Sequence, residues 1–546
     1  MITKVHIRGY RKFKELVLNP HHEMNIIVGA NEAGKSTLLE AITMALTGKF
    51  EGVTASEALN PYWFNMELVD AFFNALSNTK AGAPLPAIPE FRIDIHLEVP
   101  DGESQKMRGI HNMLKEDSVG LSVHAYPDPD YSEEIEQYFR EDNCPHILPV
   151  EYYRLDWRDF ADQVVYRRPK ELGVAVIDTR TIRSDRGMDY YTRQIVEERL
   201  DPKVRNHVSV EHRKMRASLG DGLLTVLDGA LGTDFSVFRQ LKLGIQVDQS
   251  RSSSWANTLV PAIDKVPFSQ SGKGTQAIAK TVLAMGRSSE SSAYLLVEEP
   301  ENHLSHTSLR ELLSYISALR EGRQVLVTTH SSYVLNRLGL DQLVLLHEGT
   351  AHAFQELSDD TSEYFKKLSG FDTLRLVLAK KAVLVEGPSD EIVFNRFFLD
   401  KYGAEPLDYG VDVISIGGVS FRRGFELASV LNRQLVALRD NDGKTPEHWQ
   451  DKIKEFTKPN ERELFVGDPN LGRTLEYQIQ SANSEDTIRT VLGIDNETDL
   501  LDWMSTHKTA TALKIATSPV KLNPPKYIAD AINSLNSVVS RTSGLS

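Results

Sequence analysis

The eight residues from Gly29 to Ser36 constrain the fold more than any other part of the sequence. They read Gly-Ala-Asn-Glu-Ala-Gly-Lys-Ser and fit the pattern G-x-x-x-x-G-K-[ST]. The apolar run Met24–Val28 precedes them and a helical run from Thr37 follows them, so the pattern stands between a strand and a helix. Backbone amides of such a loop surround phosphate groups at a helix N-terminus. The sequence therefore predicts an α/β P-loop fold.

Six residues of this loop and of the turn after it are expected to contact ATP. Lys35 would reach the β- and γ-phosphates, and the hydroxyl of Ser36 would bind the Mg²⁺ that accompanies the nucleotide. Backbone amides would supply further contacts. The expected nucleotide-binding residues are Gly29, Asn31, Gly34, Lys35, Ser36 and Thr37.

Length and composition limit the class of protein. At 546 residues, of which 41% are hydrophobic, the chain suggests roughly two to four globular domains. No stretch approaches the roughly 18 consecutive apolar residues of a membrane helix, and the N-terminus lacks the apolar segment of a secretory signal. The single cysteine, Cys144, cannot form an internal disulfide bond. We expect a cytoplasmic protein that makes no membrane contact.

The net charge of −14 does not exclude a nucleic-acid partner, because phosphate contacts depend on a local basic surface rather than on the sum over the chain. Residues 180–216 contain ten Lys and Arg residues against six Asp and Glu residues. Two interpretations stay open for this segment, a surface that contacts DNA and a solvated helical face. The sequence slightly favours the solvated face.

Two more apolar strands lead into side chains that can act chemically. Tyr294–Val297 is followed by Glu298 and Glu299, and Val325–Thr328 is followed closely by His330. A carboxylate at a strand end suits Mg²⁺ coordination, and a second one can orient and deprotonate an attacking water. Taken alone, a pair of Glu residues is usually a solvated strand end, and a lone His is usually structural.

Carboxylates follow apolar strands again in the last third of the chain. The strand Ala382–Val385 leads into Glu386, and the strand Leu435–Leu438 leads into Asp440 and Asp442. Two carboxylates separated by one residue can share a divalent cation, and a third from a neighbouring strand can complete the site. A calcium-binding EF-hand loop is excluded, because no Glu lies at the distance that such a loop requires.

The order of the first motifs resembles the ABC-type ATPases of DNA repair. Ser271, Gly272 and Gly274 are similar to the signature loop of those proteins, which contacts the γ-phosphate held by a second copy. His330 stands in the position of their switch histidine, and Glu298 replaces a more usual Asp. The resemblance implies ATP held between two ATPase heads in a head-to-tail dimer, with a tetramer as the larger alternative.

The later motifs resemble a Toprim domain, as found in topoisomerases, primases and OLD (overcoming lysogenization defect) nucleases. The resemblance rests on strand-Glu386-Gly, on the strand and turn from Val413 to Gly418, and on strand-Asp440-x-Asp442. An ATPase followed by a Toprim domain, with Glu298 at the metal position, is similar to the OLD family over nearly the whole chain. It is also similar to the nuclease subunit of Gabija-type phage defence.

This resemblance implies a role for each site residue. In the ATPase part, Ser36 and Glu298 would hold Mg²⁺ and Glu299 would act as the catalytic carboxylate. In the Toprim part, Mg²⁺ or Mn²⁺ would bind at two positions, and a lysine before a C-terminal helix would neutralise charge in the transition state. The implied ligands are Glu386, Asp390, Asp440, Asp442 and Glu476, and the implied lysine is Lys526.

The expected fold is α/β, with an ABC-type P-loop ATPase head that carries a helical dimerisation insert and with a C-terminal α/β Toprim domain. Helical spacing over about Asp189–Leu241 supports the insert, whereas the Asn-, Ala- and Pro-rich residues 59–89 suggest an irregular surface excursion. The expected parts are residues 1–189 and 256–355 for the ATPase domain, 190–255 for the insert, 356–378 for a linker, and 379–546 for the Toprim domain with a helical extension.

The function that fits these motifs is an ATP-regulated, metal-dependent DNA endonuclease, with anti-phage defence as its expected setting. Double-stranded DNA, a second copy of the chain and a helicase-like protein are the expected partners. The alternative is an ATP-switched DNA-binding clamp whose Toprim fold does not cleave. Retention of Glu386, Asp440 and Asp442 argues against that alternative, because a non-cleaving site would be free to lose carboxylates that repel one another.

Overall fold

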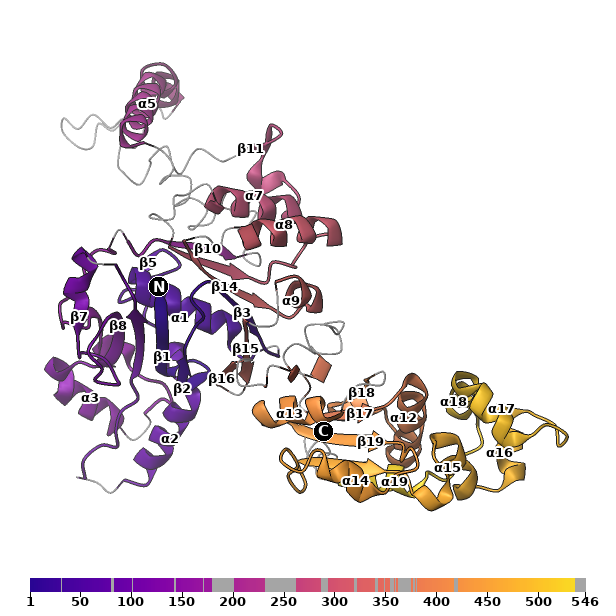
Figure 1. The fold of residues 1–546 in the computed structure, drawn as a ribbon. Helices are drawn as coiled ribbons and strands as arrows, with labels where there is room; N and C mark the ends of the chain where they lie inside the picture. The colour runs from indigo at the N-terminus through magenta and orange to yellow at the C-terminus, as the bar shows by residue number, and fades with distance from the viewer. Residues whose placement is uncertain are drawn as a thin grey trace. The chain divides into compact units, whose positions relative to one another are not determined.

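The computed structural model describes residues 1–178, 201–230, 262–285, 293–361 and 375–535, apart from short gaps at 31, 80–82, 101, 142–143, 170, 319–321, 339–341, 348, 354–357, 359, 377–378, 380 and 417–420 (Figure 1). The chain forms two compact units. One contains Met1–Asn25, Gly34–Thr329 and Glu348–Thr350, and the other contains Ile26–Ala33, His330–His347 and Ala351–Ser546.

An antiparallel sheet forms the first part of the chain. Its strand order is β2 (Phe13–Leu18), β1 (Ile2–Tyr10), β6 (Phe91–Leu97), β8 (Ser118–Pro127) and β7 (Arg108–Gly109), and β9 (Tyr153–Asp159) also pairs with β8. The strict alternation of apolar and polar residues over 91–99 is typical of a strand, and β6 covers this stretch as far as Leu97. Because β6 lies inside the sheet, its polar residues are buried as well, and Asp94 accepts hydrogen bonds from the Ser122 hydroxyl and the Met113 amide at 2.7 and 2.6 Å.

The second sheet contains the strands that precede the ATPase motifs. Its order is β10 (Val174–Asp178), β13 (Tyr294–Glu298), β14 (Gln324–Thr329), β3 (Met24–Val28), β15 (Leu343–His347) and β16 (Thr350–Ala353). Strands β3, β13 and β14 are buried along their whole length, as uninterrupted apolar runs in a parallel sheet should be. The sequence predictions for β3, β13 and β14 are therefore confirmed.

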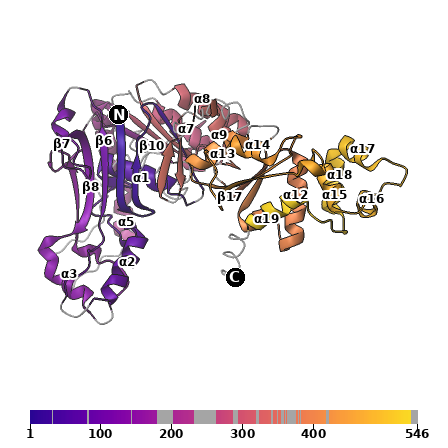
Figure 2. The same ribbon diagram turned by 60° about the horizontal axis from the view of Figure 1, so that its bottom comes forward.

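A third, parallel sheet organises the C-terminal part. Its order is β18 (Val411–Ser415), β17 (Lys381–Val385), β19 (Gln434–Arg439) and β20 (Arg462–Val466). Helices α12 (Pro388–Tyr402) and α19 (Lys526–Ser534) pack against these strands. Figure 2 shows α16 (Glu485–Leu492), α17 (Leu500–Thr506) and α18 (Lys508–Thr517) beyond α12, on the side away from the sheet.

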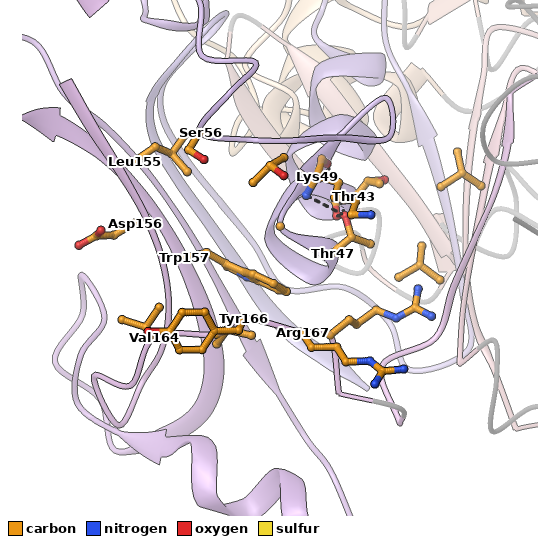
Figure 3. Close-up of a pocket in the computed structure, with 16 residues that line it drawn as sticks. Thr43, Thr47, Lys49, Ser56, Leu155, Asp156, Trp157, Val164, Tyr166 and Arg167 are labelled. Carbon is orange, nitrogen blue, oxygen red and sulfur yellow. Dashed lines mark hydrogen bonds between the residues drawn. The ribbon is translucent and has the colours of Figure 1, made fainter. Parts of the chain in front are cut away.

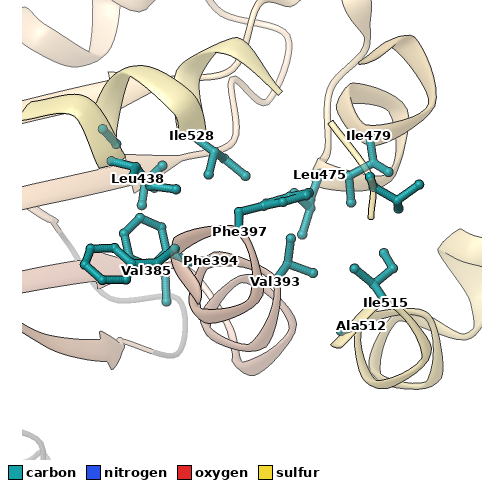
Figure 4. Packing of buried hydrophobic residues seen from close by; sticks show 14 of the residues in the cluster. Val385, Val393, Phe394, Phe397, Leu438, Leu475, Ile479, Ala512, Ile515 and Ile528 are labelled. Atoms are coloured by element: carbon teal, nitrogen blue, oxygen red, sulfur yellow. The ribbon is translucent and has the colours of Figure 1, made fainter. Parts of the chain in front are cut away.

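The core of this part lies on one face of the third sheet and extends along α12. Phe394 and Phe397 of α12 pack with Leu438 of β19 and with Leu475 of α15 (Leu475–Ala482), as Figure 4 shows. The same cluster continues to Ile515 of α18. The hydrophobic residues of the C-terminal helices thus hold those helices to the strands that carry the expected metal ligands.

The expected irregular excursion over residues 59–89 is wrong in its first half. This segment contains a 3-10 helix, Pro61–Trp63, and the helix α2 (Met66–Ser77). Asn60 and Asn65 are not loop residues but helix caps, because each side-chain oxygen accepts a backbone N–H two or three residues later. Asn-rich composition marks helix starts as well as turns, and this ambiguity misled the prediction.

The expected dimerisation insert is described only in part. Helix α5 (Pro202–Ala230) agrees with helical structure in this region, whereas residues 179–200 and 231–261 lie outside the described residues. Most of the expected linker also lies outside them, although Thr361 is buried and its hydroxyl donates to Glu426. The domain borders stay predictions. Among the described residues, no helix combines the length and the apolar character needed to cross a membrane.

Truncation of Phe397 tests the core. We expect Phe397→Ala to lower the free energy of unfolding by about 3–5 kcal/mol, because the ring is 2% exposed and packs between α12 and the sheet. The matched variant Phe397→Leu should lose less than half as much. Urea unfolding followed by tryptophan fluorescence measures both, and equal stability of the alanine variant and the wild type would contradict this packing.

Candidate active sites

The P-loop leads into α1 (Lys35–Thr47) through a glycine that no other residue could replace without strain. Gly34 is the N-cap of α1 with a φ of 98°, and a Cβ atom there would lie 2.8 Å from the ring of Phe13. Lys35 and Thr37 of the first turn are buried, and Ser36 is partly exposed. The contacts of these residues with phosphate stay a prediction. Asn31, another expected contact, lies outside the described residues.

Strands β13 and β14 present the other expected ATPase residues. Glu298 ends β13 and is 7% exposed, and Glu299 follows with a φ of 43°. A left-handed backbone costs a non-glycine residue about 1 kcal/mol or more, and here it is held because the Glu299 amide donates to the Thr328 carbonyl at 2.9 Å. The side-chain amide of Asn302 donates to Glu299 Oε2 at 3.0 Å. His330 comes directly after β14 and is exposed.

The expected signature loop forms the start of α7 (Lys273–Met285). Ser271 and Gly272 precede this helix, and the buried Gln276 donates from its side chain to the Ser271 carbonyl at 2.7 Å. Gly274 packs closely, since a Cβ atom there would lie 2.7 Å from the His303 carbonyl oxygen. Gly272 is exposed. A loop with this support can present its backbone to another molecule without rearranging.

The third sheet places the expected Toprim carboxylates at one edge. Parallel strands β17 and β19 are neighbours, Glu386 follows the end of β17, and Asp440 follows the end of β19. Asp390 lies in the first turn of α12 and accepts a hydrogen bond from the Gly387 amide at 3.0 Å. Because the carboxyl ends of adjacent parallel strands meet at one edge, residues more than fifty positions apart form one site.

Burial and mutual repulsion perturb the acidity of three of these carboxyl groups. Burial, and after it the charges of Asp390, Glu386 and Glu476, together raise the pKa of Asp440 to about 8. Burial likewise raises the pKa of Glu386 to about 7 and that of Asp390 to about 6. Such clustered shifts are typical of a functional site. The negative charge of this site is therefore stabilised either by protonation of the carboxylates or by a bound cation.

Asn441, which the sequence prediction treated as a spacer, organises the turn between the two Asp residues. It is 0% exposed, its side-chain amide donates to the Gly472 carbonyl at 2.6 Å, and its side-chain oxygen accepts from the Gly443 amide at 2.8 Å. The link to Gly472 ties the turn to the loop before α15, which carries Glu476. Glu476 is 3% exposed and accepts from the Thr474 hydroxyl.

Arg439 lies between two of the carboxylates. Its Nε atom is 3.6 Å from Glu386 Oε1, and one terminal nitrogen is 3.2 Å from Asp442 Oδ2. The guanidinium carbon lies 3.5 Å from the ring centre of Trp449, and this stacking fixes its position. Arg439 lowers the pKa of Glu386. Arg439 thus partly neutralises the carboxylates in the absence of a metal ion. The sequence prediction missed this residue, because an Arg at a strand end belongs to no motif.

The chemistry of these residues fits a divalent cation. Glu386 Oε1 is buried and has no hydrogen-bond partner among the described residues, and carboxylate oxygens are the preferred ligands of Mg²⁺. Among the residues that the structure describes, no three acidic, His or Cys side chains stand close enough together to hold an ion. A bound ion would therefore require these side chains to rotate toward it, in place of Arg439.

The structure adds Lys508 and Tyr527 to the expected site. Lys508 starts α18, and its Nζ atom is 3.9 Å from Glu476 Oε1. Tyr527 is buried, and after burial itself the charges of the site carboxylates, Asp440 first, raise its pKa. Lys526 is exposed at the first position of α19, directly before Tyr527. Neither added residue belongs to a sequence motif, and the role of Lys526 stays a prediction.

The raised pKa of Asp440 predicts a pH-dependent stability. The folded chain without metal holds a proton on Asp440 that the unfolded chain releases near pH 4, so stability falls as pH rises from about 4 through 8. Asp440→Asn cannot ionise, and we expect it to be more stable than wild type at pH 8 by about 1–3 kcal/mol. Thermal unfolding in EDTA at pH 5 and pH 8 measures this difference, which should shrink at pH 5. A pH-independent difference would refute the assignment.

Arg439 predicts the direction of a change in metal affinity. Because its charge opposes a cation between Glu386 and Asp442, Arg439→Gln should bind Mn²⁺ about tenfold more tightly at pH 8, or about 1.4 kcal/mol. Arg439→Lys, which keeps the charge, is the matched control and should stay near the wild-type affinity. Calorimetric titration with Mn²⁺ measures both, and weaker binding by the Gln variant would show that Arg439 supports the ion instead.

Comparisons with known proteins identify the two parts of the chain. An AAA-domain family model matches residues 4–75, and a second AAA-domain model, whose description names the AbiEii toxin of a type IV toxin–antitoxin system, matches residues 252–336. The model of the overcoming lysogenization defect protein-like TOPRIM domain matches residues 377–442. The matched segments contain the P-loop, the signature and carboxylate motifs, and Glu386 with Asp440.

Two curated proteins share a short segment with this chain. The DNA replication and repair protein RecF of Desulforamulus reducens is 45% identical over 47 residues, which is 9% of this chain and 13% of RecF. The uncharacterized protein MJECL10 of Methanocaldococcus jannaschii is 43% identical over 49 residues, which is 9% of this chain and 22% of that protein. The chain thus matches only a small part of either protein's length.

Among solved structures, the C-terminal region of the Burkholderia pseudomallei OLD protein is similar at 19% identity and a TM-score of 0.24. That match covers 30% of this chain and 99% of the solved one. The family models carry the assignment, because they match the ATPase segments and the Toprim segment separately and in order. With an ATPase part followed by an OLD-like Toprim domain, the chain has the architecture of the OLD family.

Proposed function

We propose that this chain is an ATP-regulated, divalent-metal-dependent DNA endonuclease. The observation that carries the proposal is a cluster of carboxylates at the edge of an OLD-like Toprim sheet, formed by Glu386, Asp390, Asp440 and Glu476. Burial, and after it the charges of neighbouring carboxylates, raise the pKa of the first three. A purely structural core gains nothing from four such carboxylates, because burying like charges costs free energy. A site that binds cations gains affinity from the same arrangement.

In this proposal Glu386, Asp390, Asp440, Asp442 and Glu476 hold Mg²⁺ or Mn²⁺, and two bound ions supply activation of the attacking water and stabilisation of the leaving 3′-oxygen. The protein fixes the backbone positions from which these side chains can turn toward an ion, through the two parallel strands and the link from Asn441 to Gly472. Tyr527 is buried and lies near enough to the site carboxylates for their charges to raise its pKa. Lys508 supplies a positive charge near the carboxylates.

Lys526 completes the proposed catalytic group. It starts α19 one position before the buried Tyr527 and is exposed to solvent. The ammonium group of Lys526 stays hydrated in the free protein. When DNA binds, it can approach a phosphodiester and neutralise negative charge in the transition state. Lys508 offers the same chemistry from α18, and alanine variants of the two lysines would separate their contributions.

We propose that the ATPase part regulates access to the Toprim site. Lys35 and Ser36 would bind the nucleotide phosphates and their Mg²⁺, with Glu298 at the metal and Glu299 on the attacking water. Gly272 is exposed, as a signature loop that contacts the nucleotide of a second copy should be. In this proposal the regulated unit is therefore a dimer of ATPase heads or a tetramer. Nucleotide can control DNA access to the Toprim site only if it binds more tightly to one arrangement of the ATPase heads than to the other.

We also propose a role in anti-phage defence and a helicase-like partner, because the motifs resemble those of Gabija-type systems. A cytoplasmic location is proposed from the composition of the chain and its single cysteine. Double-stranded DNA is the proposed substrate. The alternative, an ATP-switched clamp that binds DNA without cleaving it, draws support from the separation of the carboxylates, no three of which can hold an ion as they stand in the described part of the chain. A cleavage assay distinguishes the two functions.

The first test is cleavage of supercoiled plasmid with Mg²⁺ or Mn²⁺, with and without ATP. We expect wild type to nick or linearise the plasmid and Asp440→Ala to lose at least about a hundredfold of that rate, because it removes a ligand of the proposed ions. Lys35→Ala should abolish the effect of ATP. In the wild type, a higher cleavage rate with ATP would show that nucleotide licenses cleavage, and a lower rate would show that it restrains cleavage. ATP hydrolysis by Asp440→Ala should stay at the wild-type rate and serves as the control for folding. Intact plasmid in every lane, with ATP hydrolysis preserved, would support the clamp.

A further inference from the structure

A cavity of about 610 Å³ lies at the C-terminal end of α1, away from the P-loop. Its volume is within the range of small-molecule sites. Figure 3 shows Trp157, Tyr166 and Arg167 around it, with Thr43 and Thr47 at the end of α1. Since α1 has 13 residues, the cavity and the phosphate end of the helix are about 20 Å apart. The cavity is therefore separate from the proposed ATP site.

The wall of the cavity carries a net positive charge. Lys49, Arg167 and Arg168 line it together with one carboxylate, Asp156. That carboxylate is already matched, because Arg154 and Arg158 each lie 3.1 Å from it. Among the described residues, no carboxylate forms an ion pair with Arg167. The C-terminal end of α1 opposes an anion by at most about half a unit charge, which is less than the charge of Arg167 alone.

A rigid aromatic surface stands beside these cations. The indole nitrogen of Trp157 donates to the Ala45 carbonyl of α1 at 2.8 Å. Gly48, the C-cap of α1 with a φ of 67°, supports the ring, because a Cβ atom there would lie 2.4 Å from the indole. Trp157 is thus fixed before any ligand arrives. Tyr166 is 91% exposed at the same cavity and adds a second ring.

We propose that this cavity binds a nucleoside phosphate, either as a free nucleotide or as a nucleotide of a DNA strand. The base stacks on Trp157 or Tyr166, which every base can do because each has a π face. The phosphate binds the guanidinium of Arg167, whose planar set of donors matches phosphate oxygens. The hydroxyls of Thr54 and Ser56 line the same cavity and can bond to the sugar. This inference does not depend on cleavage by the Toprim site.

The test uses the full chain in EDTA and two probes that avoid the P-loop. One probe is a 12-nucleotide single strand with a 5′-phosphate and a 3′-fluorophore, read by anisotropy. The other is thymidine monophosphate, read by calorimetry, since it lacks the β- and γ-phosphates that a P-loop holds. The variants are Tyr166→Ala and Arg167→Glu. Their matched controls are Tyr62→Ala and Arg108→Glu, because Tyr62 is 68% exposed and the Arg108 side chain is 50% exposed, both outside the cavity.

We expect each cavity variant to raise the dissociation constant about fivefold or more, as loss of a stacking ring or a charged phosphate contact should, and each control to change it by less than about twofold. Weakening with both probes supports a site for either form of the ligand. Weakening with the single strand alone assigns the site to DNA, and weakening with the mononucleotide alone assigns it to a free nucleotide. Unchanged binding of both probes by both cavity variants, with ATP hydrolysis intact, would overturn the proposal.

Discussion

Repulsion among buried carboxylates is the constraint on which the C-terminal half of this protein depends. Asp440 and Glu386 lie at the ends of adjacent parallel strands, and burial together with their neighbours' charges raises their pKa values to about 8 and about 7. The surrounding structure counters this repulsion with Arg439 and with the Gly387 amide, which donates to Asp390. The same repulsion makes a divalent cation the natural occupant of the site.

The helix after the P-loop has a comparable importance in the N-terminal half. Its first turn begins at a left-handed glycine and presents Lys35, and its last turn ends at a second left-handed glycine against Trp157. A rigid helix transmits displacement between its two ends, so a ligand in the cavity beside Gly48 and a nucleotide at Lys35 would act on one element. Whether the two sites are coupled is decided by the difference in affinity that each ligand produces for the other.

Local patterns predicted the strands well because burial leaves a direct signature in the sequence. The apolar runs before Gly29, Glu298, Glu386 and Asp440 are all strands with boundaries within about one residue of expectation. The residues around Asn60 and Asn65 were misjudged, because a helix cap and a turn use the same side-chain hydrogen bond to a nearby amide. Only contacts with distant residues, such as Phe73 against Phe139, separate the two cases.

The sequence by itself determined the class of both sites, because a P-loop and strand-end carboxylates carry their chemistry in adjacent residues. It also determined the strands that lead into these motifs, whose burial is indicated by apolar runs. Only the tertiary structure decided which residues complete the Toprim site. Arg439, Lys508 and Tyr527 come from a strand end and two helices that no motif marks, and they reach the site because the sheet and its packed helices bring together residues up to about 140 positions apart. Their roles depend on distance and burial, which are properties of the folded chain.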